Sequence, residues 1–195
     1  MGSQVESIRN EIVESIETKS NFLVCEKSIE TMDVVSRVIV ERYEKKNKLL
    51  MAGNGGSAAD AQHIAGELVS RFYFDRPALS AVALTTDTSI LTAIGNDYGY
   101  ENLFSRQIEA NGAEGDVFIA LSTSGNSKNI IKALEVAKSK KVITVGLSGS
   151  NVGAMDELCD YMIKVPSTST PRIQEVHIVI GHILCMLVER KLFGS

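Results

Sequence analysis

Histidine and carboxylate side chains form the pattern in this sequence with the clearest chemical potential. His63 and Glu67 are four residues apart, so on a helix they share one face and can converge on one metal ion or one substrate carbon. The same spacing also occurs in ordinary hydrogen-bonded pairs on helix surfaces. A second polar group interrupts an apolar stretch near the C-terminus and consists of Gln174, Glu175, His177 and His182.

The two C-terminal histidines need partners, because an imidazole buried in apolar surroundings carries a desolvation cost. One of them could be a core histidine that bonds to a backbone carbonyl, but two such residues on one helix are less expected. His63 is then the natural third member of a site. Imidazoles combined with a carboxylate suit zinc or another divalent transition metal.

Two segments rich in glycine and hydroxyl groups, Gly53–Ser57 and Ser122–Ser127, each follow an aliphatic run and precede a helical pattern. A helix start offers unpaired backbone N–H groups and the positive end of the helix dipole, and hydroxyl groups add further donors. Glycine and serine also simply make tight turns, which is the alternative reading of either segment. Two such segments in one chain favour binding of a phosphorylated ligand that carries many hydroxyl groups.

A dinucleotide site is the main rival interpretation of the first segment, since Gly53, Gly55 and Ala58 fit the spacing G-x-G-x-x-G/A. The acidic residue that binds the ribose should follow about 20 residues later, at the end of the second strand. Asp87 lies well beyond that point and Asp75 precedes the strand. Neither segment contains the Gly-Lys-[Ser/Thr] of a nucleotide triphosphate loop. Dinucleotide binding is therefore disfavoured.

The elements that must position these residues alternate between strand and helix. Helical periodicity begins at Val5, and neither glycine nor proline occurs between Gln4 and Leu50. Ser57 is expected to cap the helix after the first strand, and Pro171 to open the last helix. Such alternation predicts a parallel α/β sheet with both phosphate-binding segments at the carboxyl ends of strands. The expected strands are Leu49–Ala52, Ala81–Leu84, Val117–Leu121, Val142–Leu147 and Tyr161–Val165, with a helix over Asn129–Lys138.

Composition excludes several classes of function. The 195 residues, 44% of them hydrophobic, can bury a full core in one domain, for which we expect an N-terminal helical arm over residues 1–47 and an α/β core over residues 48–195. A net charge of −4 without a basic run argues against nucleic-acid binding. Three cysteines without C-x-x-C spacing indicate reduced thiols in the cytoplasm. The apolar stretch Val176–Val188 is too short to span a membrane and is expected to be a buried helix.

Taken together, these motifs resemble those of the sugar isomerase (SIS) domain family, and within it those of the phosphoheptose isomerases. The likeness covers nearly the whole chain and rests on ordered motifs: Gly53–Ser57, Asp60–His63, Gly95–Asp97, Ser122–Ser127, Arg172–Glu175 and His182. It implies a doubly wound five-stranded parallel sheet flanked by helices. It also implies a cytoplasmic homotetramer that converts sedoheptulose 7-phosphate to glycero-manno-heptose 7-phosphate. That reaction would be the first step towards activated heptose for lipopolysaccharide or another surface glycan.

The resemblance also implies roles for individual residues. Glu67 and His182 would form the acid/base pair, and one zinc ion per site, or another divalent metal, would be held by His63, Glu67, Gln174 and His182. Gln174 is the less secure ligand, since eight residues separate it from His182, a rise of about 12 Å along a helix. Gly66 departs from the usual Ala or Glu of relatives and could loosen Glu67. The substrate would be bound by Asn54, Gly55, Gly56, Glu67, Asn96, Asp97, Ser122, Thr123, Ser124, Ser127 and Gln174.

Two alternatives share this fold. A SIS adaptor protein, such as the relatives that bind the bacterial replication initiator, would need no isomerase chemistry and would have little reason to keep the complete set of candidate ligands. A SIS sensor that reads sugar phosphates for transcription would need a DNA-binding module, and the sequence shows none.

Overall fold

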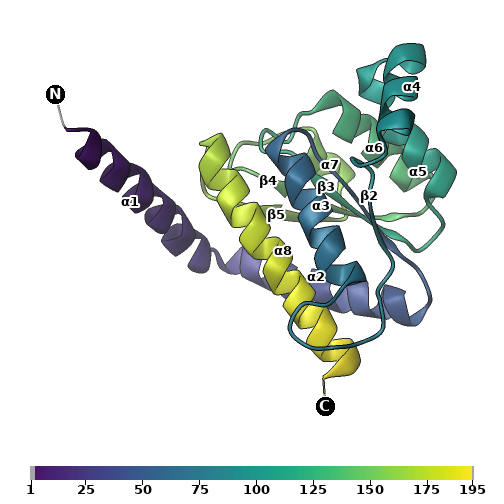
Figure 1. The fold of residues 1–195 in the computed structure, drawn as a ribbon, viewed down its shortest axis with the longest axis horizontal. Helices are drawn as coiled ribbons and strands as arrows, with labels where there is room; N and C mark the ends of the chain where they lie inside the picture. The colour runs from purple at the N-terminus through teal and green to yellow at the C-terminus, as the bar shows by residue number, and fades with distance from the viewer. Residues whose placement is uncertain (1–2, 195) are drawn as a thin grey trace.

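The core of the fold is a sheet of five parallel strands. The computed structural model describes residues 3–194. Within them the strands are β1 (Leu49–Ala52), β2 (Ala81–Ala83), β3 (Val117–Leu121), β4 (Ile143–Ser148) and β5 (Tyr161–Lys164). Their spatial order is β2-β1-β3-β4-β5, so the chain starts in the interior and winds outward in both directions (Figure 1). The doubly wound sheet predicted from the sequence is confirmed, with each strand within one residue of its expected bounds.

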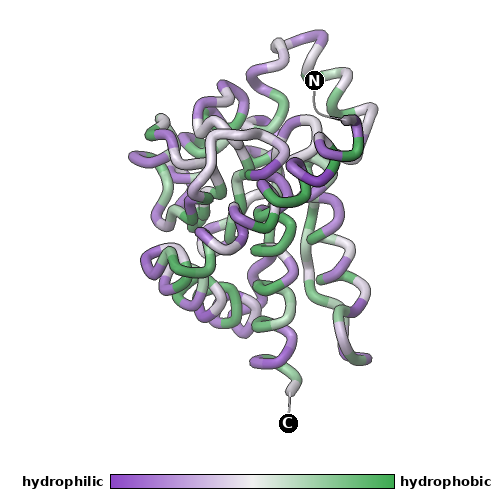
Figure 2. Tube along the Cα trace, turned by 90° about the vertical axis from the view of Figure 1, so that its left-hand side faces the viewer, coloured by the Kyte–Doolittle hydropathy of each residue, from purple (hydrophilic) through white to green (hydrophobic). Residues whose placement is uncertain are grey.

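Helices cover both faces of the sheet. They are α1 (Gln4–Leu23), α2 (Glu26–Glu44), α3 (Gly56–Val69), α4 (Thr88–Tyr98), η1 (Tyr100–Asn102), α5 (Ser105–Asn111), α6 (Lys128–Ser139), α7 (Met155–Leu158) and α8 (Thr170–Phe193). Along most of them hydrophobic and hydrophilic residues alternate, as expected for helices with one side against a core (Figure 2).

The alternation of side chains along the strands divides the buried residues into two cores. Leu49 and Met51 of β1 face a core shared with α2, α3 and α8, whereas Leu50 and Ala52 face a core shared with α5 and α6. The first core contains the elements that carry all three histidines. Helix α8, which includes the apolar stretch Val176–Val188, is packed in that core, and no helix among residues 3–194 is long and apolar enough to cross a membrane.

The N-terminal region consists of two helices with different surroundings. Helix α1 projects away from the body, whereas α2 packs against α8 and β5 (Figure 1). Seven residues of α2 are buried, but only Thr18 and Phe22 are buried in α1. The projecting arm is therefore α1 alone, and α2 belongs to the packed core.

The start of α3 differs from the expected cap. Its N-cap position is Gly55, which has φ 56°, and Ser57 is buried within the first turn and makes no capping hydrogen bond. The glycine can take this left-handed backbone without steric cost, so the helix begins two residues earlier than it would with Ser57 as the cap. The prediction for Pro171 is confirmed, since it occupies the first turn of α8.

Candidate active site

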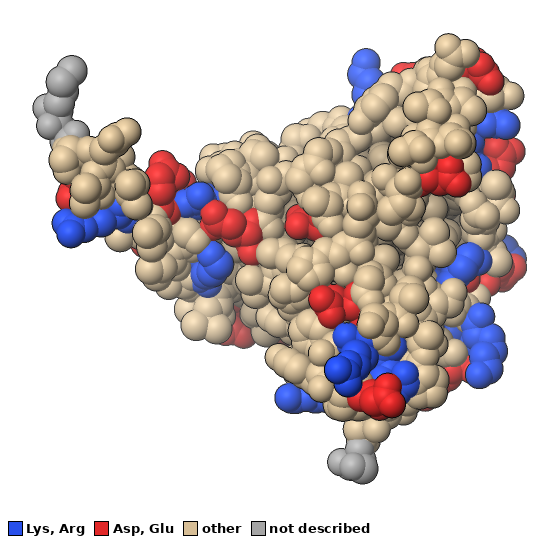
Figure 3. Space-filling model, viewed as in Figure 1, with Lys and Arg blue, Asp and Glu red and all other residues tan. Residues whose placement is uncertain are grey.

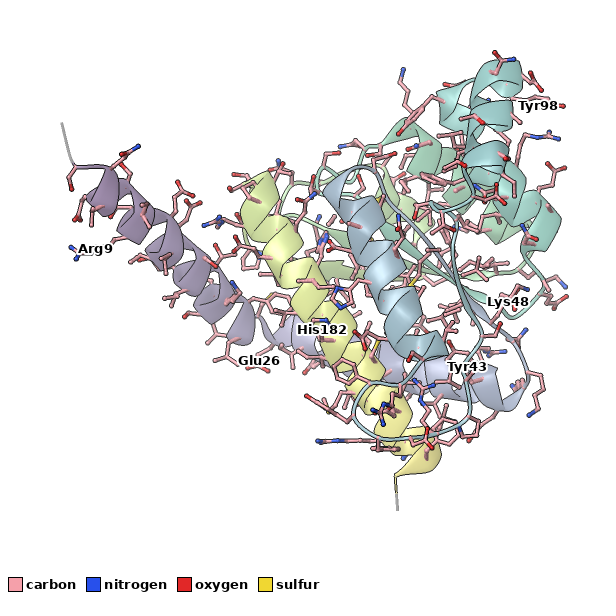
Figure 4. All side chains as sticks on the ribbon, in the orientation of Figure 1. Arg9, Glu26, Tyr43, Lys48, Tyr98 and His182 are labelled. Atoms are coloured by element: carbon pink, nitrogen blue, oxygen red, sulfur yellow. The ribbon has the colours of Figure 1, made fainter. Side chains whose placement is uncertain are left out.

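The contact between α3 and α8 brings three potential metal ligands together. Nε2 of His63 lies 3.1 Å from Oε1 of Glu67 and 3.3 Å from Nε2 of His182. All three donor atoms lie within 4.8 Å of one another. Figure 4 shows His182 on α8 where that helix faces α3. The structure thus brings together three of the four side chains that the family resemblance places at the metal, and their roles stay predictions.

A small residue makes this approach of the helices possible. A Cβ atom added to Gly181 would lie 2.5 Å from Cδ1 and 2.6 Å from Cγ1 of Ile64, which is closer than real carbon atoms pack. Gly181 precedes His182, and Ile64 follows His63. The closest part of the helix contact is thus next to both imidazoles, whose ring centroids lie 4.9 Å apart in an edge-to-face arrangement.

The chemistry of this group fits a divalent metal. Two imidazoles and one carboxylate are the donor set of many zinc sites, with metal–ligand bonds of about 2.0–2.2 Å. Donor atoms in a tetrahedron of that size lie about 3.3–3.6 Å apart, close to the 3.1 Å and 3.3 Å separations of His63 from Glu67 and from His182. Two imidazole nitrogens that face each other can share only one proton, or both can turn lone pairs toward one cation.

Gln174 lies at a different level of the two helices. Its side-chain amide packs against the backbone of Gly56, where an added Cβ would lie 2.7 Å from both Nε2 and Oε1. Gly56 is seven residues before His63, a rise of about 10 Å along α3. Within one chain Gln174 therefore lines the start of α3, near the carboxyl end of β1, and its role as a metal ligand stays a prediction.

The second predicted phosphate-binding segment gathers hydroxyl groups at the start of α6. The Ser122 hydroxyl lies 2.9 Å from the Ser127 hydroxyl and 3.5 Å from that of Ser124. The N–H of Asn126 donates to the Ser124 hydroxyl, and Ser127 is the N-cap residue without a capping hydrogen bond of its own. Thr123 is half-buried between them. This geometry presents hydroxyl and helix N–H donors to one anion.

A pair of asparagines links the two segments. Asn54, after β1, donates to Oδ1 of Asn129 at 2.9 Å, and Asn129, in the first turn of α6, donates to Oδ1 of Asn54 at 2.8 Å. The Tyr100 hydroxyl donates to the same Asn54 oxygen at 3.0 Å. Asn129 is 2% exposed. The sequence reasoning missed both partners, although the position of Asn129, two residues after Ser127, was an available signal.

Helix α4 forms the far wall of a hollow over the first segment. The hollow has a volume of about 330 Å³, and Gly95 lines it opposite Gly53, Asn54 and Gly55. Asn96 and Asp97 follow Gly95 on α4, are exposed, and hydrogen bond to each other at 2.7 Å. Their predicted contacts with a sugar stay predictions, because among residues 3–194 their side chains hydrogen bond only to each other.

His177 belongs to the core and not to the site. It is 0% exposed, and among residues 3–194 neither ring nitrogen has a hydrogen-bond partner of good geometry. Burial lowers the pKa of His177 to about 4, an effect that the backbone of Ser148 opposes only in part. This side chain is therefore a neutral core imidazole, and its expected pairing is not found.

An additional carboxyl group lies one turn before His63. Asp60 is half-buried, and its Oδ2 has no partner among the described residues. Burial raises the pKa of Asp60 to about 6, and the nearby His63 opposes the rise. Sequence reasoning included Asp60 in a motif but gave it no role.

Comparison with known proteins places this geometry in a family. Residues 12–149 match the SIS domain family, and the chain belongs to that family. It is 64% identical over 188 residues to phosphoheptose isomerase 2 of Campylobacter jejuni, covering 96% of this chain and 94% of that protein. It is also 64% identical over 188 residues to the phosphoheptose isomerase of Aneurinibacillus thermoaerophilus, with 96% and 95% covered.

Solved structures agree with these relatives. A phosphoheptose isomerase from Francisella tularensis superposes with a TM-score of 0.93 at 32% identity, covering 97% of this chain and all of the other. The enzyme from Neisseria gonorrhoeae gives 0.90 at 38% identity, with 96% and 99% covered. Within the SIS family the chain is thus of the phosphoheptose isomerase type, an enzyme that isomerises sugar phosphates.

Proposed function

We propose that this enzyme converts sedoheptulose 7-phosphate to glycero-manno-heptose 7-phosphate by proton transfer between C1 and C2. The observation that carries the proposal is the convergence of His63, Glu67 and His182 in a chain of the phosphoheptose isomerase type. The phosphate of this substrate is at the far end of the carbon chain from the reacting carbons. A hydroxyl-rich segment separate from the acid/base group suits such a substrate.

The acid/base work is assigned to two residues of the α3–α8 contact. Glu67 removes a proton from C1 of the ketose while His182 protonates the oxygen on C2, which gives the enediol. Glu67 then returns its proton to C2 while His182 takes back the hydroxyl proton on O1, which gives the aldose. Both side chains are partly exposed and can reach a ligand. A general base and acid in position contribute typically about 10²–10⁴-fold to the rate of such a step.

Zinc or another divalent ion would be held by His63, Glu67 and His182, and when bound it would stabilise negative charge on the substrate oxygens. Gln174 is the proposed fourth ligand, and because it lies at the start of α3 within one chain, it would have to come from another copy of the chain. Ser122, Thr123, Ser124 and Ser127 would bind the phosphate with the N–H groups at the start of α6. Asn54, Gly55, Gly56, Asn96 and Asp97 are proposed to contact the sugar hydroxyl groups.

A homotetramer is part of the proposal. Five large apolar residues of α1, Val5, Ile8, Ile12, Val13 and Ile16, are 48–60% exposed, which supports burial against other copies of the chain. The upper part of the face formed by α3 and α8 is also largely free of charged side chains (Figure 3). The product would enter heptose activation in the cytoplasm, for lipopolysaccharide or another surface glycan.

The adaptor function is the competing proposal, and one experiment separates the two. Zinc-loaded protein is incubated with sedoheptulose 7-phosphate, with fructose 6-phosphate as comparison, and NMR follows the aldose phosphate. Selective conversion of the heptulose is expected. Binding of the heptulose without turnover would favour the adaptor, and the absence of both would refute the assigned substrate.

A further inference from the structure

A buried ion pair closes the lower ends of α3 and α8, outside the proposed ligand set. Nε of Arg76 donates to Oε1 of Glu189 at 3.1 Å, and the two side chains are 1% and 0% exposed. Arg76 lies in the loop after α3, and Glu189 in the last turns of α8. Charged groups buried this fully are retained in proteins only where they are paired and hydrogen bonded.

Arg76 also holds the C-terminal end of α3. Its guanidinium donates to the carbonyl oxygens of Glu67 at 3.0 Å, Leu68 at 2.7 Å and Ser70 at 3.1 Å. Glu67 and Leu68 belong to the last turn of α3 and Ser70 is its C-cap residue, a region where carbonyl groups lack partners within the helix. One of them is the backbone of Glu67 itself, so the arginine fixes the turn that carries a proposed ligand.

Glu189, on α8, binds the backbone of the loop that follows α3. Its carboxylate accepts the backbone N–H of Phe72 at 2.8 Å and that of Tyr73 at 2.7 Å. The ring of Phe72 in turn packs on the ring of His182, with centroids 5.7 Å apart. The same carboxylate therefore fixes the residue that covers one side of the His182 imidazole.

We propose that Arg76 and Glu189 are positioning residues for the metal-binding group. They set the position of the Glu67 turn relative to α8 and keep Phe72 against His182, so their loss weakens metal binding beyond any general loss of stability. Outer partners that hydrogen bond directly to the ligating groups typically change metal affinity about 10–100-fold, and Arg76 and Glu189 act on the same ligands through the backbone of Glu67 and through Phe72. The inference rests on the proposed function, because it takes His63, Glu67 and His182 as metal ligands.

The test replaces Glu189 by glutamine, which keeps the shape of the side chain but turns an NH₂ group toward donors that need an oxygen. Asp116→Asn is the matched control. Asp116 is also buried, and it accepts the N–H groups of Lys48 and Ala113 together with the Lys48 ammonium, at the amino ends of β1 and β3. Both substitutions are expected to lower the thermal midpoint.

Metal affinity is measured on the folded proteins by competition of Zn²⁺ or Co²⁺ with a chromophoric chelator, together with the visible spectrum of the Co²⁺ form. Glu189→Gln is expected to weaken binding about 10–100-fold and to change the Co²⁺ spectrum, whereas Asp116→Asn leaves both unchanged. Phe72→Leu keeps the ion pair and is expected to change the Co²⁺ spectrum, which provides a test if Glu189→Gln does not fold.

Unchanged affinity and spectrum in folded Glu189→Gln, or in folded Phe72→Leu if the first variant does not fold, would overturn the inference. Equal weakening in Asp116→Asn would overturn it too, since the effect would then be general. Failure of the unmodified protein to bind either metal would refute the proposed metal site, and this inference with it.

Discussion

Two glycines on the facing helices, Gly66 and Gly181, should respond oppositely to the same substitution. Gly66 lies inside α3 with helical backbone, and a Cβ added there meets nothing within 4 Å. Gly181 lies inside α8, where the added atom would lie 2.5 Å from Cδ1 of Ile64. Replacement by alanine therefore separates helix propensity from packing.

The expected magnitude at Gly66 follows from propensity alone. Alanine favours a helix interior by about 1 kcal/mol over glycine, so Gly66→Ala should raise the free energy of unfolding by about 0.5–1 kcal/mol. For a chain of this size that corresponds to a rise in the unfolding midpoint of about 1–4 °C. The change should also stiffen the turn that carries Glu67.

The same gain at Gly181 is opposed by overpacking. Ile64 is 2% exposed and packed in the core, and inserted methyl groups in such cores cost about 1–3 kcal/mol. The net effect of Gly181→Ala is then a loss of up to about 2 kcal/mol. Trimming the neighbour in the double variant Gly181→Ala, Ile64→Val should recover part of that loss.

The assay is reversible denaturant unfolding of the four variants at one protein concentration, with Ile64→Val measured alone to complete a double-mutant cycle. A stabilising Gly66→Ala, a destabilising Gly181→Ala and a favourable coupling between the changes at Gly181 and Ile64 are expected. If Gly181→Ala stabilises as much as Gly66→Ala, the helices do not approach as closely as described, and the account of the site geometry fails.

Three further predictions concern the site and the core. Glu67→Gln should lower kcat about 10²–10⁴-fold while heptulose phosphate binding persists in calorimetry, and near-normal turnover would remove Glu67 from the base role. Asn129→Ala should raise KM about tenfold with little change in kcat, because Asn54 loses a buried partner worth about 1–3 kcal/mol; an unchanged KM would show that the bridge does not orient Asn54. His177 stays neutral in the fold down to a pKa of about 4 but takes up a proton near pH 6.5 when unfolded, so stability falls as pH drops. Between pH 7 and 5 the unmodified protein should lose about 2 kcal/mol more than His177→Leu in unfolding experiments, and parallel profiles would contradict this.

Much of the fold was predictable because its signals are local. The five strands were recognised as short aliphatic runs between turns, and their alternation with helices predicted the parallel sheet. The helix start at Ser57 was predicted wrongly, because a serine cap and a left-handed glycine offer competing ways to begin a helix. The glycine at position 55 decided the outcome.

The polar partners of the site were less accessible to sequence reasoning. Asn54 and Asn129 are 75 residues apart in the chain, and Phe72 and Glu189 are 117 apart. Nothing in the local sequence around either member specifies its partner, since such contacts depend on which helices pack together. From the sequence alone, the buried Arg76 cannot be distinguished from an arginine in an exposed loop.

The sequence by itself determined the elements, the positions of both predicted phosphate-binding segments and the residue types available for chemistry. Only the tertiary structure decided which C-terminal histidine meets His63. His177 and His182 are five residues apart, so they point about 140° away from each other around α8, and only one of them can face α3. Helical periodicity fixes that angle within a helix but not the rotation of the helix against its neighbours. The close contact of Gly181 with Ile64 sets this rotation, turning His182 toward the site and His177 into the core.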